Sequence, residues 1–147
     1  MPTKYQGTDE EVRSLNAFIK LSRASESITN RLIKNLSCHG LTISQFGVLE
    51  ALLHLGCQNQ KELGAKLLKS GGNITMVIDN LVKRGYVTRV TDPNDRRAVI
   101  ISLTEEGKAF IEEYFPLHLE KIVEEFSVLT PEENKELARL CKKVGMK

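Results

Sequence analysis

The 147-residue chain contains no tryptophan, few aromatic residues (5%) and only three cysteines, which stand at wide spacings. An odd number of dispersed cysteines argues against a disulfide scaffold. No apolar run approaches the roughly 20 residues that a membrane span needs, and the first residues lack the apolar core of a signal peptide. These absences predict a cytoplasmic protein that makes no contact with a membrane and consists of one domain, or of one domain plus an extension.

Catalytic chemistry has few candidate residues in this sequence. The three histidines are dispersed, and no nucleophile, base and orienting group cluster along the chain. Gly71 and Gly72 lack the pattern of a phosphate-binding loop. His54 and Cys57 have a spacing that could share a metal, but too few carboxylates and histidines stand near them. The sequence therefore predicts no enzyme, no cofactor and no metal site.

The net charge of +2 is unevenly distributed. Residues 1–60 carry 6 basic and 5 acidic side chains, residues 61–97 carry 8 and 4, and residues 98–147 carry 7 and 10. The positive excess thus lies in the middle segment, whereas the last segment is acidic. This asymmetry is typical of a chain that presents one face to phosphates, although a solvated lysine-rich face gives the same counts.

Two long helical segments are predicted on either side of the centre of the chain. Thr8 and Glu11 have the spacing of a capping box, and an apolar stripe continues from there to Gly40. The second segment starts at Thr104. We expect Pro116 to kink or restart it, because proline removes an intrahelical donor.

A last helix is predicted to begin at Pro131, with an apolar side that includes Cys141 turned inward. These outer helices are too apolar on one side to lie in water. One small core cannot cover both, so we expect residues 1–40 and 105–147 to be dimerisation elements that pack against a second copy of the chain.

The central part combines three helices with a β-hairpin. The sequence predicts helices over residues 42–55, 59–68 and 70–84, and strands over residues 86–91 and 98–103. Five apolar residues of the third helix have the spacing of a core face: Ile74, Val77, Ile78, Leu81 and Val82. The predicted fold class is mainly α with a small β-hairpin. It is a winged helix-turn-helix over residues 41–104, flanked by the dimerisation helices.

With that face turned inward, the third helix exposes groups that suit DNA. Asparagine can bond an adenine edge, and threonine and methionine can meet a thymine methyl group. The amides at the helix start suit a phosphate, and Gly72 allows the backbone to approach closely. A polar face of this kind is also common on helices that bind nothing. The candidate contacts are Ser70, Gly72, Asn73, Thr75, Met76, Asn80, Lys83 and Arg84.

The hairpin adds two arginines to this interpretation. Arg96 and Arg97 follow a tight turn, where their side chains find no core, and arginine at such a tip suits a narrow minor groove. Asp95 and Asp79 are expected to orient an arginine rather than to touch DNA. The alternative is a solubilised hairpin with a local ion pair of little energetic weight. The candidate contacts here are Arg89, Asn94, Arg96 and Arg97.

Three stretches carry a family resemblance: SGGNITMVIDNLVKRG over residues 70–85, YVTR over residues 86–89, and DPNDRRAVIISLTEEG over residues 92–107. Together they closely resemble the MarR family of transcriptional regulators, and the similarity covers nearly the whole chain. The resemblance implies a two-fold homodimer whose recognition helices contact a pseudo-palindrome in successive major grooves of double-stranded DNA. It also implies that Asp79 and Arg97 form an acid–base pair between helix and wing.

A narrower similarity concerns the molecule that is sensed. FIKLSRA over residues 18–24, the pair Phe115 and Pro116 followed by His118, and KKVG over residues 142–145 look like the subgroup that senses quinones and catechols.

Family members often bind phenols or aromatic acids where the dimer helices meet the winged domain, or react through a cysteine. Cys38 is the redox candidate, because the neighbouring His39 could favour its thiolate. Ordinary packing or a solvated surface is the alternative for each candidate. The candidates for an effector pocket are Ser22, Arg23, Phe46, Leu49, His54, Tyr114 and His118.

The predicted function is that of a dimeric repressor of a pseudo-palindromic operator. A small phenolic or quinone-like molecule, or modification of a thiol, would release it from DNA. The alternative is a helical dimeric adaptor protein that does not bind DNA.

Overall fold

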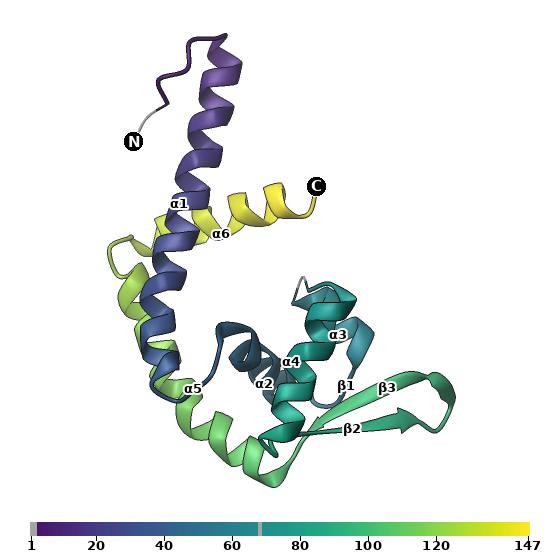
Figure 1. Cartoon of the computed structure of the whole chain (residues 1–147). Helices are drawn as coiled ribbons and strands as arrows, with labels where there is room; N and C mark the ends of the chain where they lie inside the picture. Colours follow the sequence, from purple (N-terminus) through teal and green to yellow (C-terminus); the bar gives the residue numbers. More distant parts are fainter. Residues whose placement is uncertain (1–2, 68) are drawn as a thin grey trace.

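A computed structural model describes residues 3–67 and 69–147, and helices dominate it (Figure 1). A hairpin projects from one end of the molecule, and α1 and α5 run side by side at the other. In chain order the elements are α1 (Asp9–Ser37), α2 (Ile43–Leu55), β1 (Gln58–Asn59), α3 (Gln60–Lys66), α4 (Gly71–Lys83), β2 (Val87–Asp92), β3 (Asp95–Leu103), α5 (Glu105–Phe126) and α6 (Pro131–Gly145).

Side-chain caps set where the helices begin. Thr8, Thr42 and Thr130 each form a reciprocal capping box before α1, α2 and α6, which satisfies backbone N–H groups that have no partner inside the helix. Asn59 and Ser70 accept hydrogen bonds from the first turns of α3 and α4. The predicted helix starts are therefore confirmed. The predicted end of the helix over residues 59–68 lies outside the described residues.

The sheet is larger than the predicted hairpin. Its strand order is β1-β3-β2 with antiparallel pairing, and the two-residue strand β1 was not predicted. The β2–β3 hairpin closes with Asp92 opposite Asp95. Its register shifts between Thr91 and Asp92, so Arg96 and Arg97 lie in an irregular stretch at the start of β3. The strand thus begins three residues earlier than predicted.

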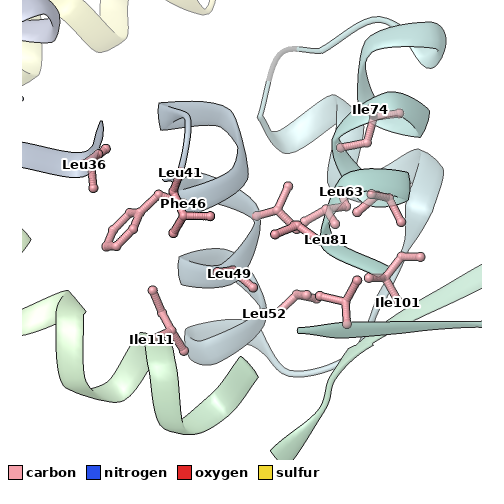
Figure 2. Packing of buried hydrophobic residues seen from close by; sticks show 13 residues of the cluster. Leu36, Leu41, Phe46, Leu49, Leu52, Leu63, Ile74, Leu81, Ile101 and Ile111 are labelled. Atoms are coloured by element: carbon pink, nitrogen blue, oxygen red, sulfur yellow. The ribbon is translucent and has the colours of Figure 1, made fainter. Parts of the chain in front are cut away.

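The core lies where α2 and α4 pack on the sheet, and α5 closes one side of it (Figure 2). Three of the five residues predicted for the core face of α4 are buried, namely Ile74, Ile78 and Leu81. Val77 is half-buried. Val82 is 39% exposed, so its placement in the core was wrong. The apolar stripe of α4 is narrower than its spacing predicted.

The flanking helices leave apolar side chains uncovered by this chain. Arg31 holds α1 against α5 through a bidentate contact with Glu125, in which Nε lies 2.7 Å from Oε1 and Nη2 lies 2.7 Å from Oε2. No residue of α6 is buried, and Cys141 is exposed, which corrects its predicted inward placement. The reason is that α6 lies away from the core of the winged part, across α1 (Figure 1).

Helix α5 continues through Pro116, so the predicted restart is wrong. Proline removes one helical hydrogen bond. Contacts of the residues before Pro116 hold the helix in place. Ile111 is buried, and the Phe115 ring lies against that of His54 with 4.7 Å between ring centres. Within the described ranges, no helix is long and apolar enough to cross a membrane.

A close backbone approach at Gly107 gives a test of this packing. A Cβ atom on Gly107 would lie 2.0 Å from the Tyr86 carbonyl oxygen, so Gly107→Ala forces β2 and α5 apart. We expect the free energy of unfolding to fall by about 1–3 kcal/mol, measured by urea denaturation. Gly72→Ala is the control, because nothing lies within 4 Å of that site in another first helical turn. Equal stability of the two variants would contradict the packing described.

Candidate nucleic-acid interface and adjoining pocket

The outward face of α4 is polar and open. Ser70 caps the helix by accepting a hydrogen bond from the Asn73 backbone N–H at 3.3 Å. Asn73, Met76 and Asn80 line a groove together with the start of α2. Met76 adds an apolar side chain to this face and is 62% exposed. These side chains stand on a rigid helix beside the hairpin.

The hairpin tip is shaped by two aspartates. Asp92 accepts a hydrogen bond from the Asn94 backbone N–H, and Asp95 accepts one from the Arg97 backbone N–H at 2.9 Å. Asp95 therefore holds Arg97 through its main chain. The side chains of Arg96 and Arg97 stay exposed.

A salt bridge joins the hairpin to α4, but not the one that the resemblance implied. Asp79 pairs with Arg89 at 2.7 Å, so the predicted pair of Asp79 and Arg97 is wrong. Arg89 lies within β2, which contacts α4. Arg97 lies at the irregular start of β3, where it lines a groove with Gly71 in the first turn of α4. Arg89 thus contacts the middle of α4, whereas Arg97 lies near its first turn.

Arg84 makes a contact within the chain. Its Nη2 donates a hydrogen bond to the Gly40 carbonyl oxygen at 2.6 Å, and its guanidinium lies 6.0 Å from the centre of the Tyr86 ring. It therefore ties the C-terminal end of α4 to the loop between α1 and α2. Arg84 therefore has a structural contact in addition to the phosphate contact that the sequence predicts for it.

A pocket opens between the end of α1, the start of α2 and the middle of α5. It brings together three predicted effector residues, Phe46, Tyr114 and His118, with the redox candidate Cys38. Sequence analysis missed most of the others, although the spacing of His118 and Lys121 on one helix face could have revealed the α5 side. The full lining is Asn35, Leu36, Cys38, His39, Phe46, Tyr114, Leu117, His118, Glu120 and Lys121.

Four predicted effector residues lie elsewhere. Ser22 and Arg23 are exposed halfway along α1, and neither lines this pocket. Leu49 is fully buried in the core. His54 bonds the Glu50 carbonyl oxygen through Nδ1 at 2.9 Å. These four residues therefore do not line the pocket that contains Phe46.

Aromatic contacts connect the pocket to the end of α4. His39 lies on Tyr114 with 4.1 Å between ring centres, Tyr114 on Phe110 at 4.6 Å, and Phe110 on Tyr86 at 4.8 Å. The last ring carries the guanidinium of Arg84. A continuous set of packed side chains therefore joins the pocket wall to the polar helix.

His118 is the titratable group that burial affects most clearly in the pocket. Desolvation lowers the pKa of its imidazole below the ordinary value, against an opposing effect of the Glu50 carboxylate. Its ring lies 4.5 Å from that of Phe46, and its Nδ1 atom is buried without a partner in the described part of the chain. The neutral imidazole thus presents an unused polar atom beside an aromatic wall.

The metal hypothesis for His54 and Cys57 finds no support in the geometry. The Cys57 Sγ atom accepts a hydrogen bond from the Ser102 hydroxyl at 3.1 Å. Among residues 3–67 and 69–147, no group of three or more metal-ligating side chains is close enough to hold an ion.

A short helix, a second helix with an exposed polar face, and a hairpin packed beside it define a winged helix-turn-helix protein. The MarR family model matches residues 41–99. MhqR, an HTH-type transcriptional regulator of Bacillus subtilis strain 168, is 39% identical over 134 residues, which cover 91% of this chain and 92% of MhqR. The chain belongs to the MarR family of transcriptional regulators.

Two solved structures agree with this assignment. A mutant of MarR from Escherichia coli in complex with operator DNA has a TM-score of 0.78 and 30% identity, and the match covers 95% of this chain and 99% of that one. BpsR of Bordetella bronchiseptica, whose DNA binding is regulated by 6-hydroxynicotinic acid, has a TM-score of 0.80 and 27% identity, with 88% and 98% covered.

The lowered pKa of His118 predicts how stability depends on pH. The unfolded chain binds the His118 proton more readily than the folded chain, so stability is full above the unfolded pKa of about 6.5 and is lost as the pH falls below it. We expect His118→Gln to flatten the fall in unfolding free energy between about pH 7.5 and 5.5. His54→Gln is the control, and urea unfolding is the measurement. An unchanged slope in His118→Gln would contradict the prediction.

Proposed function

We propose that the protein is a homodimeric repressor that binds a pseudo-palindromic operator and leaves it when a small aromatic molecule enters the pocket. The observation that carries the proposal is the exposed polar face of α4 beside a wing that ends in two exposed arginines. The similarity to a MarR–operator complex supports it. Such a regulator acts in the cytoplasm, where its operator lies, and performs no catalysis.

We assign base recognition to α4 and phosphate or minor-groove contact to the wing. Asparagine amides, a methyl group and a thioether suit base edges in the major groove, and the guanidinium groups suit a narrow minor groove. Asp79 and Arg89 hold the wing against the helix. The proposed DNA contacts are Ser70, Gly72, Asn73, Thr75, Met76, Asn80, Lys83, Asn94, Arg96 and Arg97.

We assign dimerisation to residues 1–40 and 105–147, and DNA binding to residues 41–104. Phe18 is 66% exposed and Val144 65%, and α6 has no buried residue. Exposed apolar surface of this extent indicates that a partner covers it. We infer that the partner is a second copy of the chain, because a two-fold symmetric operator is bound by a two-fold dimer. An apolar groove supports this assignment; its lining is Leu21, Ala24, Ser25, Ile28, Thr29, Phe126, Leu137 and Cys141.

We assign the effector to the pocket between α1, α2 and α5. Its aromatic walls suit a flat ring, and the polar groups of its lining residues His118 and Lys121 suit a phenolic or carbonyl oxygen. BpsR, whose DNA binding a hydroxylated aromatic acid regulates, has a similar fold. Because Cys38 lines the same pocket, a thiol response and a binding response would arise at one place.

The division of labour on DNA can be measured by fluorescence anisotropy with the DNA upstream of the gene and with a random duplex. We expect Arg97→Ala to weaken binding to both duplexes and to lower the salt slope by about 1 per chain. Asn73→Ala should cost about 1–3 kcal/mol on the operator only. Lys135→Ala, on α6, is the control.

Equal losses on both duplexes for both variants would refute the division. Absence of specific, salt-sensitive binding by the wild type would favour the adaptor protein instead.

Release by an effector can be tested with catechol, methylhydroquinone, benzoquinone, hydroxybenzoic acids and hydrogen peroxide. We expect an aromatic compound to release both the wild type and Cys38→Ser. Leu117→Trp should bind DNA but lose the response, because the exposed Leu117 lines the pocket and a larger side chain fills it. Leu119→Trp, nearby on the same helix, is the control. If Cys38→Ser alone abolishes release from DNA, the sensor is the Cys38 thiol and not the pocket.

A further inference from the structure

The side chain of Gln60 reaches from the first turn of α3 to the exposed face of α4. Its Nε2 donates a hydrogen bond to Thr75 Oγ1 at 3.2 Å. The Thr75 hydroxyl in turn donates its proton to the Gly71 carbonyl oxygen one turn earlier, at 2.8 Å. Three residues on two helices thus share one hydrogen-bonded chain, and the sequence analysis did not single out Gln60.

The direction of these bonds follows from proton counting. A threonine hydroxyl has one proton, and here that proton goes to Gly71. The hydroxyl can therefore only accept from Gln60, which fixes the amide with its nitrogen toward Thr75 and its oxygen away. That oxygen is buried and has no partner within the described ranges, in a groove that Lys61 and Arg97 also line.

The bonded hydroxyl cannot donate to a nucleic acid. Its proton is used, so Thr75 cannot donate to a phosphate or to the N7, O6 and O4 acceptors that mark the major groove. Yet the Thr75 side chain is exposed, on the side of α4 that faces α3 and the wing, where it lines a groove with Arg97. Thr75 can therefore meet a base through its methyl group or through the second lone pair of its oxygen, and of the two only the methyl group recognises thymine.

We propose that Gln60 is a positioning residue that orients Thr75 so that the methyl group recognises the 5-methyl group of a thymine. The proposal rests on the proposed DNA-binding function and gives α4 one apolar specificity contact on the side that faces the wing. Gln60 contributes through the orientation of Thr75.

Replacing thymine by deoxyuridine tests the contact, because it removes only the 5-methyl group. Each thymine of the operator is replaced in turn, and affinity is measured by anisotropy. At one thymine of each half-site we expect the wild type to bind the deoxyuridine duplex about four-fold more weakly, the value for one buried methyl group. Thr75→Val keeps a methyl group but lacks the hydroxyl that bonds Gln60 and Gly71, so we expect it to lower this ratio in part. Thr75→Ser lacks the methyl group and should bind both duplexes equally.

Gln60→Ala should lower the thymine-to-deoxyuridine ratio at that position, since the hydroxyl loses one of its two anchors. Gln58→Ala is the matched control, because within residues 3–67 and 69–147 the hydrogen bonds of the Gln58 side chain go to Lys66 and to main-chain carbonyl groups and not to α4. Loss of stability alone would weaken both duplexes by the same factor and leave the ratio unchanged, so an unchanged ratio in Gln60→Ala overturns the positioning role.

Two other results separate the hypotheses. If the wild type binds the operator but no thymine is sensitive to the replacement, or if Thr75→Ser keeps the ratio, the methyl contact is overturned while DNA binding stands. If the wild type shows no specific binding to the unmodified operator, the proposed function itself fails.

Discussion

The packing of one side of α4 into the core is the constraint on which the rest of the structure depends. Ile78 and Leu81 are fully buried, and Ile74 is nearly so, which sets the rotation of the helix about its own axis (Figure 2). Every other side chain of α4 then has its direction decided by the helical period. The polar face that we assign to DNA is thus a consequence of apolar burial, and a different rotation would hide Asn73 and expose the core.

Two charged contacts complete what the core begins. Asp79 binds Arg89, which ties the hairpin to the middle of α4, and Arg84 binds the Gly40 carbonyl oxygen, which ties the end of α4 to the loop that walls the pocket. Both pairs are largely exposed and each contributes modestly to stability. Their importance lies in what they connect. Arg89 joins the wing to α4, and Arg84 joins α4 to the loop beside the pocket. The aromatic contacts from His39 to Tyr86 run parallel to the second connection.

Local signals predicted the elements well. The capping boxes at Thr8, Thr42 and Thr130 and the cap at Ser70 are short-range chemistry, so the helix starts came directly from the sequence. Strand β1 escaped prediction because two residues carry no periodicity, and only pairing with β3 makes them a strand. The sequence also could not predict which arginine forms the salt bridge with Asp79. Arg97 and Arg89 lie on either side of one hairpin, and a register shift decides which of them faces Asp79.

The sequence by itself determined the helices, the turn at Pro93 and Asn94, the concentration of positive charge and the family, because each depends on neighbours along the chain or on composition. Only the tertiary structure decided which side chains share a site. Phe46, Tyr114, His118 and Cys38 meet because α1, α2 and α5 converge, whereas Ser22, Leu49 and His54 point elsewhere. Likewise the bond from Gln60 to Thr75 exists only because α3 and α4 pack together. Spacing in sequence sets directions on one helix, but distances between helices are set by how their apolar faces pack.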